Sequence, residues 1–320
     1  MSDASSGSPT GAGPAWPAPD PQTTPSPSPS WSGWSQPPAP PNGPAQWPAT
    51  AQGEWQPPPL AEPRAPHPTL PLAAGVGAVL VLAASLVASK FVLDLIVDFR
   101  WPIVVYVVLL SLMGYGPSVW WVRYASTRWG SGSWIDDVGG RPRWSDLGWG
   151  PVTWLTAIGC QLAVAGLVLG FDIPLSNNTD GISELTADRA YVIAIVITAV
   201  VVAPLVEEVV FRGLVMRSLL SVMHPVAAIG LQAVLFGVAH VDPVRGAGNI
   251  GLAMVLSGVG VALGGAAYLL RRIGASIVAH AILNGVVMIL VLTGVSEQLQ
   301  EENPDLVGVV VIDETVVRPS

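Results

Sequence analysis

Long apolar runs separated by short polar segments fill the chain from residue 72 to residue 295. Most of these runs are long enough to cross about 30 Å of hydrocarbon as an α-helix. No alternating ten-residue strand pattern recurs, which argues against a transmembrane β-barrel. The pattern predicts an all-α polytopic membrane protein, a bundle of about seven transmembrane helices. The predicted spans lie near residues 72–93, 101–122, 151–171, 189–222, 225–241, 249–270 and 273–295.

The fifth span is the weakest of the seven, because His240 and Asp242 crowd its end. The sixth is rich in small residues and includes Gly260 and Gly264 four positions apart. Such spacing favours close contact between membrane helices. It predicts a tightly packed helix and requires no catalytic explanation.

Residues 1–70 have a different composition from the apolar part of the chain. They hold most of the 31 prolines, mixed with Ser, Gly, Ala and Gln and with five tryptophans, Trp16, Trp31, Trp34, Trp47 and Trp55. Such a tract cannot bury enough apolar surface to offset backbone ordering, so we expect a disordered cytoplasmic tail with polyproline II character. It serves either as a spacer or, through Pro-Trp patches such as PSWSGWSQPP, as a binding segment for an unknown partner. The transmembrane domain is then 71–295, followed by a C-terminal tail, 296–320.

Composition agrees with a membrane location. Of the 320 residues, 51% are hydrophobic and only 11% charged, and the mean hydropathy is +0.53. Soluble domains carry about a quarter charged residues. The net charge of −8 includes no basic blocks, so nucleic acid is excluded as a partner. The single cysteine, Cys160, excludes an intrachain disulfide and a cysteine-built zinc site.

The distribution of Lys and Arg predicts how the chain is oriented in a cell membrane. With seven spans, nine of these residues fall on one side: Arg64, Arg123, Arg128, Arg141, Arg143, Arg212, Arg217, Arg271 and Arg272. Five fall on the other side: Lys90, Arg100, Arg189, Arg245 and Arg318. The positive-inside rule then places the N-terminus of this multi-pass protein in the cytoplasm.

Polar residues inside the apolar runs are the candidates for chemistry. The stretch VVAPLVEEVVFRGLVMR, residues 201–217, carries adjacent carboxylates at Glu207 and Glu208. A charged residue at a bilayer centre costs about 2.5–3.5 kcal/mol on insertion scales, so such a pair indicates function. His240, His280 and Asn284 are further polar residues in apolar surroundings. A lone histidine there is usually a packing residue, but this combination favours a site.

Sequence spacing predicts that three of these side chains meet. Taking His224-Pro225 as a turn, Glu207 lies 17 residues before His224 and His240 lies 16 after it. At about 1.5 Å per residue, both stand roughly 25 Å from the turn. His280 follows the turn at 271–274 by about two helical turns. The three converge in the cytoplasmic half if the hairpin at His224 projects beyond the membrane.

Spacing within each helix suggests separate roles. Glu208 and Arg212 are four residues apart, which favours an ion pair and leaves Glu207 free to face the histidines. A partly desolvated carboxylate is a suitable base, so we expect Glu207 to activate water. His240 and His280 would position that water or bind a metal. Asn284, with one imidazole, would donate to the developing oxyanion.

Three motifs together resemble a known family. Glu207 to Arg212 matches EExxxR, Phe236 to His240 matches FxxxH, and His280 is followed four residues later by Asn284. This set resembles the motifs of the CPBP intramembrane peptidases, also called CAAX proteases and bacteriocin-processing enzymes. The resemblance covers about residues 100–295, with a motif-bearing core at about 189–295.

The resemblance implies a peptidase domain at 71–295 and an intramembrane endopeptidase activity. It implies that Glu207 activates water, that Glu208 and Arg212 support the site, and that His240, His280 and Asn284 complete the catalytic set. The substrate would be a membrane-protein tail or another peptide, prenylated or not.

Metal dependence stays open at this stage. Glu207, His240 and His280 are acceptable Zn²⁺ ligands with an open fourth position. HExxH, the usual zinc-binding helix motif, is absent, and a metal-free glutamate mechanism is equally compatible.

Two other function classes also stay open. One is a catalytically silent scaffold or bacteriocin-immunity protein, which the loss of Glu207 or a histidine would have favoured. The other is a transporter or channel using the polar cluster as a relay, against which no second half of the sequence repeats the first.

Overall fold

The computed structural model describes residues 70–176, 188–242 and 246–295. The chain divides into residues 1–60 and residues 61–320, and all described residues belong to the second unit. The predicted N-terminal and C-terminal tails lie outside the described residues, apart from Leu70, so their disorder and their partners stay predictions.

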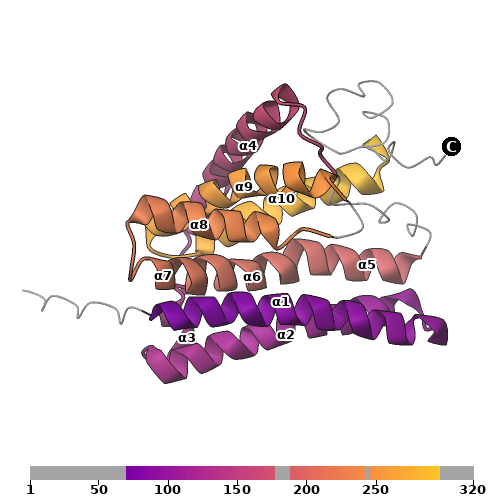
Figure 1. The fold of residues 1–320 in the computed structure, drawn as a ribbon, viewed down its shortest axis with the longest axis horizontal. Helices are drawn as coiled ribbons and strands as arrows, with labels where there is room; N and C mark the ends of the chain where they lie inside the picture. Colours follow the sequence, from indigo (N-terminus) through magenta and orange to yellow (C-terminus); the bar gives the residue numbers. More distant parts are fainter. Residues whose placement is uncertain (1–69, 177–187, 243–245, 296–320) are drawn as a thin grey trace, which may run out of the picture. The chain divides into compact units, whose positions relative to one another are not determined.

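The described part of the chain is helical and contains no strand. Its first four α-helices are separate elements, whereas α5, α6 and α7 belong to one continuous helix with two π-helical segments, η4 and η5. Figure 1 shows how these elements lie together. In chain order they are α1 (Leu72–Ile96), the 3₁₀ turn η2 (Val97–Phe99), α2 (Ile103–Trp129), α3 (Trp134–Asp137), α4 (Asp146–Gly170), α5 (Arg189–Ile197), η4 (Thr198–Val202), α6 (Ala203–Glu208), η5 (Val209–Val215), α7 (Met216–Leu219), α8 (Pro225–Val238), α9 (Gly248–Leu270) and α10 (Gly274–Leu292).

Six helices in the described residues are long and apolar enough to cross a membrane, and they have 19 to 31 residues. The seventh predicted span is α8, which has only 14 residues. It ends at Val238, short of the predicted residue 241, and the backbone N–H and C=O of Asp242 instead bond the side chain of Asn249. Six long helices and the short α8 fit the predicted bundle of about seven.

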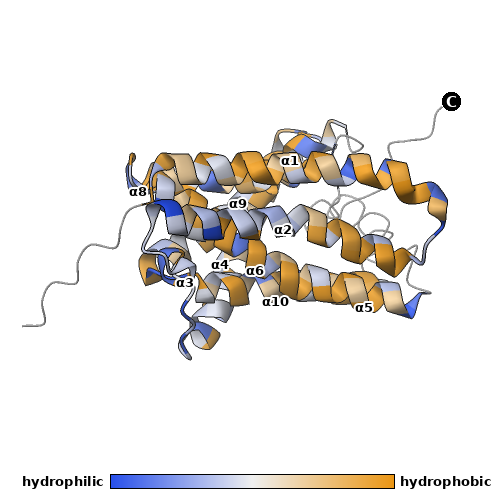
Figure 2. Cartoon of the chain, turned by 90° about the horizontal axis from the view of Figure 1, so that it is seen from below, coloured by the Kyte–Doolittle hydropathy of each residue, from blue (hydrophilic) through white to orange (hydrophobic). Residues whose placement is uncertain are grey.

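The outer surfaces of the bundle are apolar. Figure 2 shows hydrophobic residues along α1 and α5, with hydrophilic residues gathered near α3. Large exposed side chains on the outer surfaces include Leu80 and Phe91 of α1, Leu112 of α2 and Ile193 of α5. Apolar side chains exposed over such lengths are suited to lipid, so the chain is a multi-pass membrane protein.

Helix α9 is the most buried of the membrane-spanning helices and packs against α4, α8 and α10. Glycines allow this contact: a Cβ added at Gly260 would stand 2.9 Å from the Cα of Ala233 on α8. A Cβ added at Gly237 of α8 would collide with the carbonyl oxygen of Ala253 on α9. The close helix contact predicted from Gly260 is confirmed.

The helix at 189–219 carries both glutamates and is widened by the two π segments. Pro204 stands two residues after the end of η4 and has no backbone N–H to donate to the preceding turn. The N–H of Ala203 bonds the carbonyl of Thr198, five residues back. π segments inside α-helices often occur at functional sites. Here they flank α6, the six-residue segment that ends in Glu207 and Glu208.

Candidate active site

Glu208 is the buried centre of an ion-pair network. Its side chain and that of Arg212 are fully buried, and Arg212 Nη1 donates to Glu208 Oε1 at 2.8 Å. His280 Nδ1 contacts the same Oε1 at 2.9 Å. A buried charge is tolerated when it is paired and hydrogen-bonded. The predicted pair of Glu208 with Arg212 is confirmed, and the structure adds that Glu208 also orients His280.

Glu207 points to the other side of the helix, towards the two histidines. Its Oε2 lies 3.9 Å from His240 Nε2 and 3.8 Å from His280 Nε2. Its Oε1 accepts a hydrogen bond from the Tyr115 hydroxyl at 3.1 Å. Glu207 is 14% exposed and its Oε2 is buried without a hydrogen-bond partner. The three side chains therefore meet, as the spacing predicted, while their catalytic roles stay predictions.

Hydrogen bonds at the far side of each ring fix which nitrogen faces Glu207. His240 Nδ1 lies 2.8 Å from the Phe236 carbonyl oxygen, which is an acceptor only. His280 Nδ1 lies 2.9 Å from Oε1 of the Glu208 carboxylate, which is also an acceptor only. Each Nδ1 must therefore carry a proton and donate it. In the neutral rings, Nε2 is then the acceptor nitrogen, and it lies 3.9 Å (His240) and 3.8 Å (His280) from Glu207 Oε2.

Phe236 holds the three charged and polar groups in place through its ring. The ring centroid lies 4.8 Å from that of His240 and 5.7 Å from that of His280, both edge-on. The Arg212 guanidinium carbon lies 4.3 Å from the same centroid, within the range of cation–π attraction. Phe236 is 1% exposed. The phenylalanine of the FxxxH pattern thus packs the site as well as the core.

No hydrogen bond joins the Asn284 side chain to Glu207 or to either histidine. Its Nδ2 donates to the carbonyl oxygen of Ala199 in η4 at 2.8 Å. In a π-helical register that carbonyl would pair with the N–H of residue 204, which is a proline. Asn284 therefore supplies the donor that Pro204 lacks, and it ties α10 to the helix of Glu207. Its predicted donation to an oxyanion stays a prediction.

The carboxylate oxygen of Glu207 and the Nε2 atoms of His240 and His280, between which a gap remains, are the types of atom that bind a zinc ion. One carboxylate oxygen and two imidazole nitrogens leave a fourth position open, as catalytic zinc sites do. Bonds of about 2.0–2.1 Å would place tetrahedral ligands roughly 3.3 Å apart, whereas the atoms here are 3.8 and 3.9 Å apart. No group of His, Cys, Asp or Glu side chains among the described residues has the spacing of a ready metal centre. Zinc would require Glu207 and the rings to approach by about 0.5 Å.

The sequence did not predict two residues that contribute to the site, Tyr115 and Gln232. Tyr115 comes from α2, 92 residues before Glu207, and only its hydroxyl within the apolar stretch LMGYG could have drawn attention to it. Gln232 on α8 is fully buried and donates to the Gly260 carbonyl at 2.9 Å. Arg212 Nη2 donates to the same carbonyl at 3.4 Å. A buried glutamine in an apolar helix was the available signal.

Residues 189–286 match the family model of the Type II CAAX prenyl endopeptidases, Rce1-like. The family resemblance is confirmed for this segment. The CAAX protease-like segment contains all three motifs, whereas α1, α2 and Tyr115 lie outside it. The match supports intramembrane protease activity in general terms. Neither the curated proteins nor the solved structures gave a match to the chain.

Proposed function

We propose that the chain is an intramembrane endopeptidase in which Glu207 activates a water molecule held against His240 and His280. The observation that carries this proposal is the convergence of three acceptor atoms, Glu207 Oε2 and the two Nε2 atoms, on one gap. Acceptors repel one another unless a donor or a cation lies between them. A water molecule bound there would be poised next to a carboxylate base.

One water molecule offers two hydrogens to the three acceptor atoms. In the metal-free mechanism a further proton is shared between Glu207 and the rings, whereas in the zinc mechanism a cation takes its place. The occupant of the gap therefore distinguishes the two predicted mechanisms.

Glu207 then takes part in both halves of the hydrolysis. As the water oxygen bonds to the substrate carbonyl carbon, its proton passes to Glu207 Oε2. When the tetrahedral intermediate collapses, the C–N bond breaks and Glu207 returns the proton to the leaving amine. Tyr115 remains on Oε1 throughout. Glu208 and Arg212 keep His280 oriented by charge-assisted hydrogen bonds, which are stronger than neutral ones.

The substrate class that this site favours is a peptide anchored at the membrane. The active site lies among helices with apolar outer surfaces, and the matching family is that of CAAX prenyl endopeptidases. C-terminal CaaX sequences carry a prenyl chain on their cysteine. We propose a membrane-associated C-terminal peptide as the substrate, with prenylation as the feature to test first.

The test uses purified full-length protein and one peptide made with and without an S-farnesyl group. We expect cleavage by the wild type and a loss of at least about 100-fold in Glu207→Gln, since general-base catalysis contributes about 10²–10⁴-fold. Arg123→Ala, at an exposed position on α2, is the control and should cleave normally. Full cleavage by Glu207→Gln would show that another residue activates the water.

Metal analysis separates the two forms of the site. If Glu207, His240 and His280 bind zinc, the purified protein contains about one zinc ion per chain, and His240→Ala and His280→Ala lose it. A bound zinc ion would act as a Lewis acid and lower the pKa of its water. If protein without zinc cleaves at the wild-type rate, the shared proton is the correct form.

A further inference from the structure

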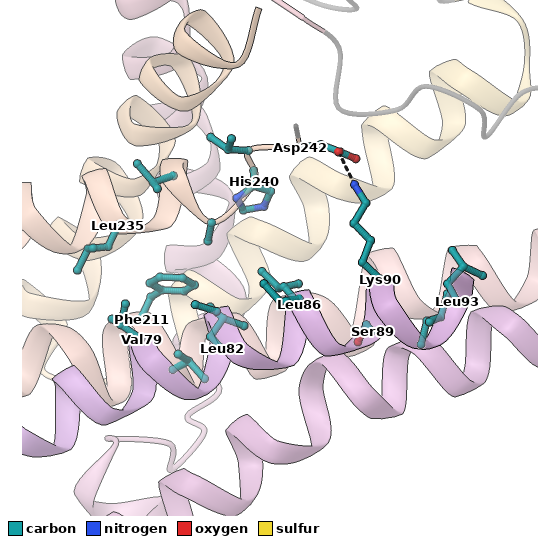
Figure 3. Close-up of a pocket in the computed structure, with 17 residues that line it drawn as sticks. Val79, Leu82, Leu86, Ser89, Lys90, Leu93, Phe211, Leu235, His240 and Asp242 are labelled. Carbon is teal, nitrogen blue, oxygen red and sulfur yellow. Dashed lines mark hydrogen bonds and ion pairs between the residues drawn. The ribbon is translucent and has the colours of Figure 1, made fainter. Parts of the chain in front are cut away.

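An apolar groove of about 620 Å³ lies beside the candidate active site, between α1 and the end of α8. Its walls include Leu82, Leu86 and Leu93 of α1, Phe211 of η5 and Leu235 of α8. His240 also lines it, so a ligand in the groove would touch a residue of the active site. Figure 3 shows His240 above the leucines of α1.

One end of this groove carries charge. Lys90 of α1 and Asp242 both line it and form an ion pair at 2.9 Å, drawn as a dashed line in Figure 3. Among the described residues that line the groove, Lys90 is the only cationic side chain apart from any protonated histidine. Asp242 stands two residues after His240, so the ammonium lies a short peptide length from the active site.

The ion pair is placed so that another carboxylate can enter. The side chains of Lys90 and Asp242 are 52% and 39% exposed, and ion pairs this exposed contribute little to stability. Asn249 holds the backbone of Asp242 on both its N–H and its C=O. The flexible stem of Lys90 can therefore turn to a new partner while Asp242 stays in place.

We propose that Lys90 binds the C-terminal carboxylate of the substrate, while the groove holds the apolar side chains that precede it. The inference rests on the proposed function, because it names the part of the peptidase substrate, its C-terminal carboxylate, that binds beside the same active site. The charges are complementary: a free carboxylate meets the ammonium, and the apolar residues meet leucine side chains. Lys90 becomes a specificity-determining residue that distinguishes chain ends from internal segments. It lies in α1, outside the segment that matches the family model.

Binding is measured separately from cleavage, in full-length Glu207→Gln protein in detergent. The probe is a fluorescein-labelled S-farnesyl peptide ending in Cys-Val-Leu-Met, prepared as the free acid and as the C-terminal amide. The lipid is common to both peptides, so a difference in affinity reports the carboxylate. We expect the acid to bind about two- to fivefold more tightly, as an exposed ion pair allows.

Two further variants in the Glu207→Gln background identify the cation. Lys90→Met should bind acid and amide equally, with the affinity for the amide unchanged. Lys90→Arg should restore the preference, and Arg100→Met, outside the groove, should keep it. Equal binding of acid and amide by the parent, or a preference that survives in Lys90→Met, would overturn the proposal. A protein that prefers the acid but never cleaves would contradict the proposed peptidase and leave the binding role of Lys90 intact.

Discussion

Tyr115 makes the two carboxylate oxygens of Glu207 different, because it bonds only one of them. Its hydroxyl occupies Oε1, so Oε2 is the oxygen left to face the histidines. Tyr115→Phe removes this hydrogen bond and leaves the carboxylate free to rotate. Hydrogen bonds to charged groups contribute about 1.5–3 kcal/mol, so we expect kcat to fall roughly 10- to 100-fold. KM should be unchanged, because Tyr115 does not line the groove proposed to hold the substrate.

The matched control for this substitution is Tyr124→Phe on the same helix. The Tyr124 ring stacks on Trp120 with centroids 5.6 Å apart, and its hydroxyl has no hydrogen bond to Glu207. We expect both of its kinetic constants to match the wild type. If Tyr115→Phe raised KM and spared kcat, Tyr115 would serve substrate binding and not the orientation of Glu207.

At the scale of helical elements, the π segment η4 is hydrogen-bonded to α10 through the side chain of Asn284. Asn284→Ala removes the donor to the Ala199 carbonyl, and an unsatisfied buried group costs about 1–3 kcal/mol. We expect the unfolding free energy in detergent to fall by this amount. Adding Pro204→Ala restores a backbone N–H for that carbonyl, so the double variant should recover stability.

The same pair of variants separates two roles of Asn284. If Asn284 also donates to the oxyanion, the double variant recovers stability but cleaves about 100- to 1000-fold more slowly than the wild type. Recovery of both properties would assign Asn284 to holding η4 alone. An unchanged unfolding free energy in Asn284→Ala would show that Ala199 finds another donor.

Two glycines of α8 offer a contrast between crowded and open positions. Gly237→Ala would place its Cβ against the Ala253 carbonyl and 2.5 Å from Ser257 Oγ, whereas nothing lies within 4 Å of a Cβ at Gly230. We expect Gly237→Ala to push α8 from α9, displace His240 and abolish cleavage. Gly230→Ala should stabilise the helix slightly, by about 0.5–1 kcal/mol. Equal melting temperatures of the two variants would contradict this account of the α8–α9 contact.

The sequence predicted the helices and the meeting of Glu207 with two histidines because both follow from apolar run length and residue spacing. It could not predict the two π segments, since a widened turn depends on partners such as Asn284 that lie 85 residues away. Tyr115 was missed for a related reason. Tyrosine is common in membrane helices, and only the packing of α2 against the helix of Glu207 gives its hydroxyl a partner.

For the molecule as a whole, the short helix α8 decides the topology. At about 1.5 Å per residue its 14 residues span only roughly 21 Å, less than a bilayer core of about 30 Å. If the predicted orientation holds, the positions before α8 and before α9 lie on opposite sides of the membrane. Labelling of single cysteines tests this in a Cys160→Ala background. Ser221→Cys precedes α8 and Ala247→Cys precedes α9, and both positions are exposed.

We expect a membrane-impermeant maleimide to label Ala247→Cys in intact cells and Ser221→Cys only after permeabilisation. Trp144→Cys, at a side chain that is 90% exposed, should behave like Ser221→Cys, because both lie on the predicted Arg-rich cytoplasmic side. Labelling of Ser221→Cys and Ala247→Cys from one side would show that α8 enters the membrane and returns.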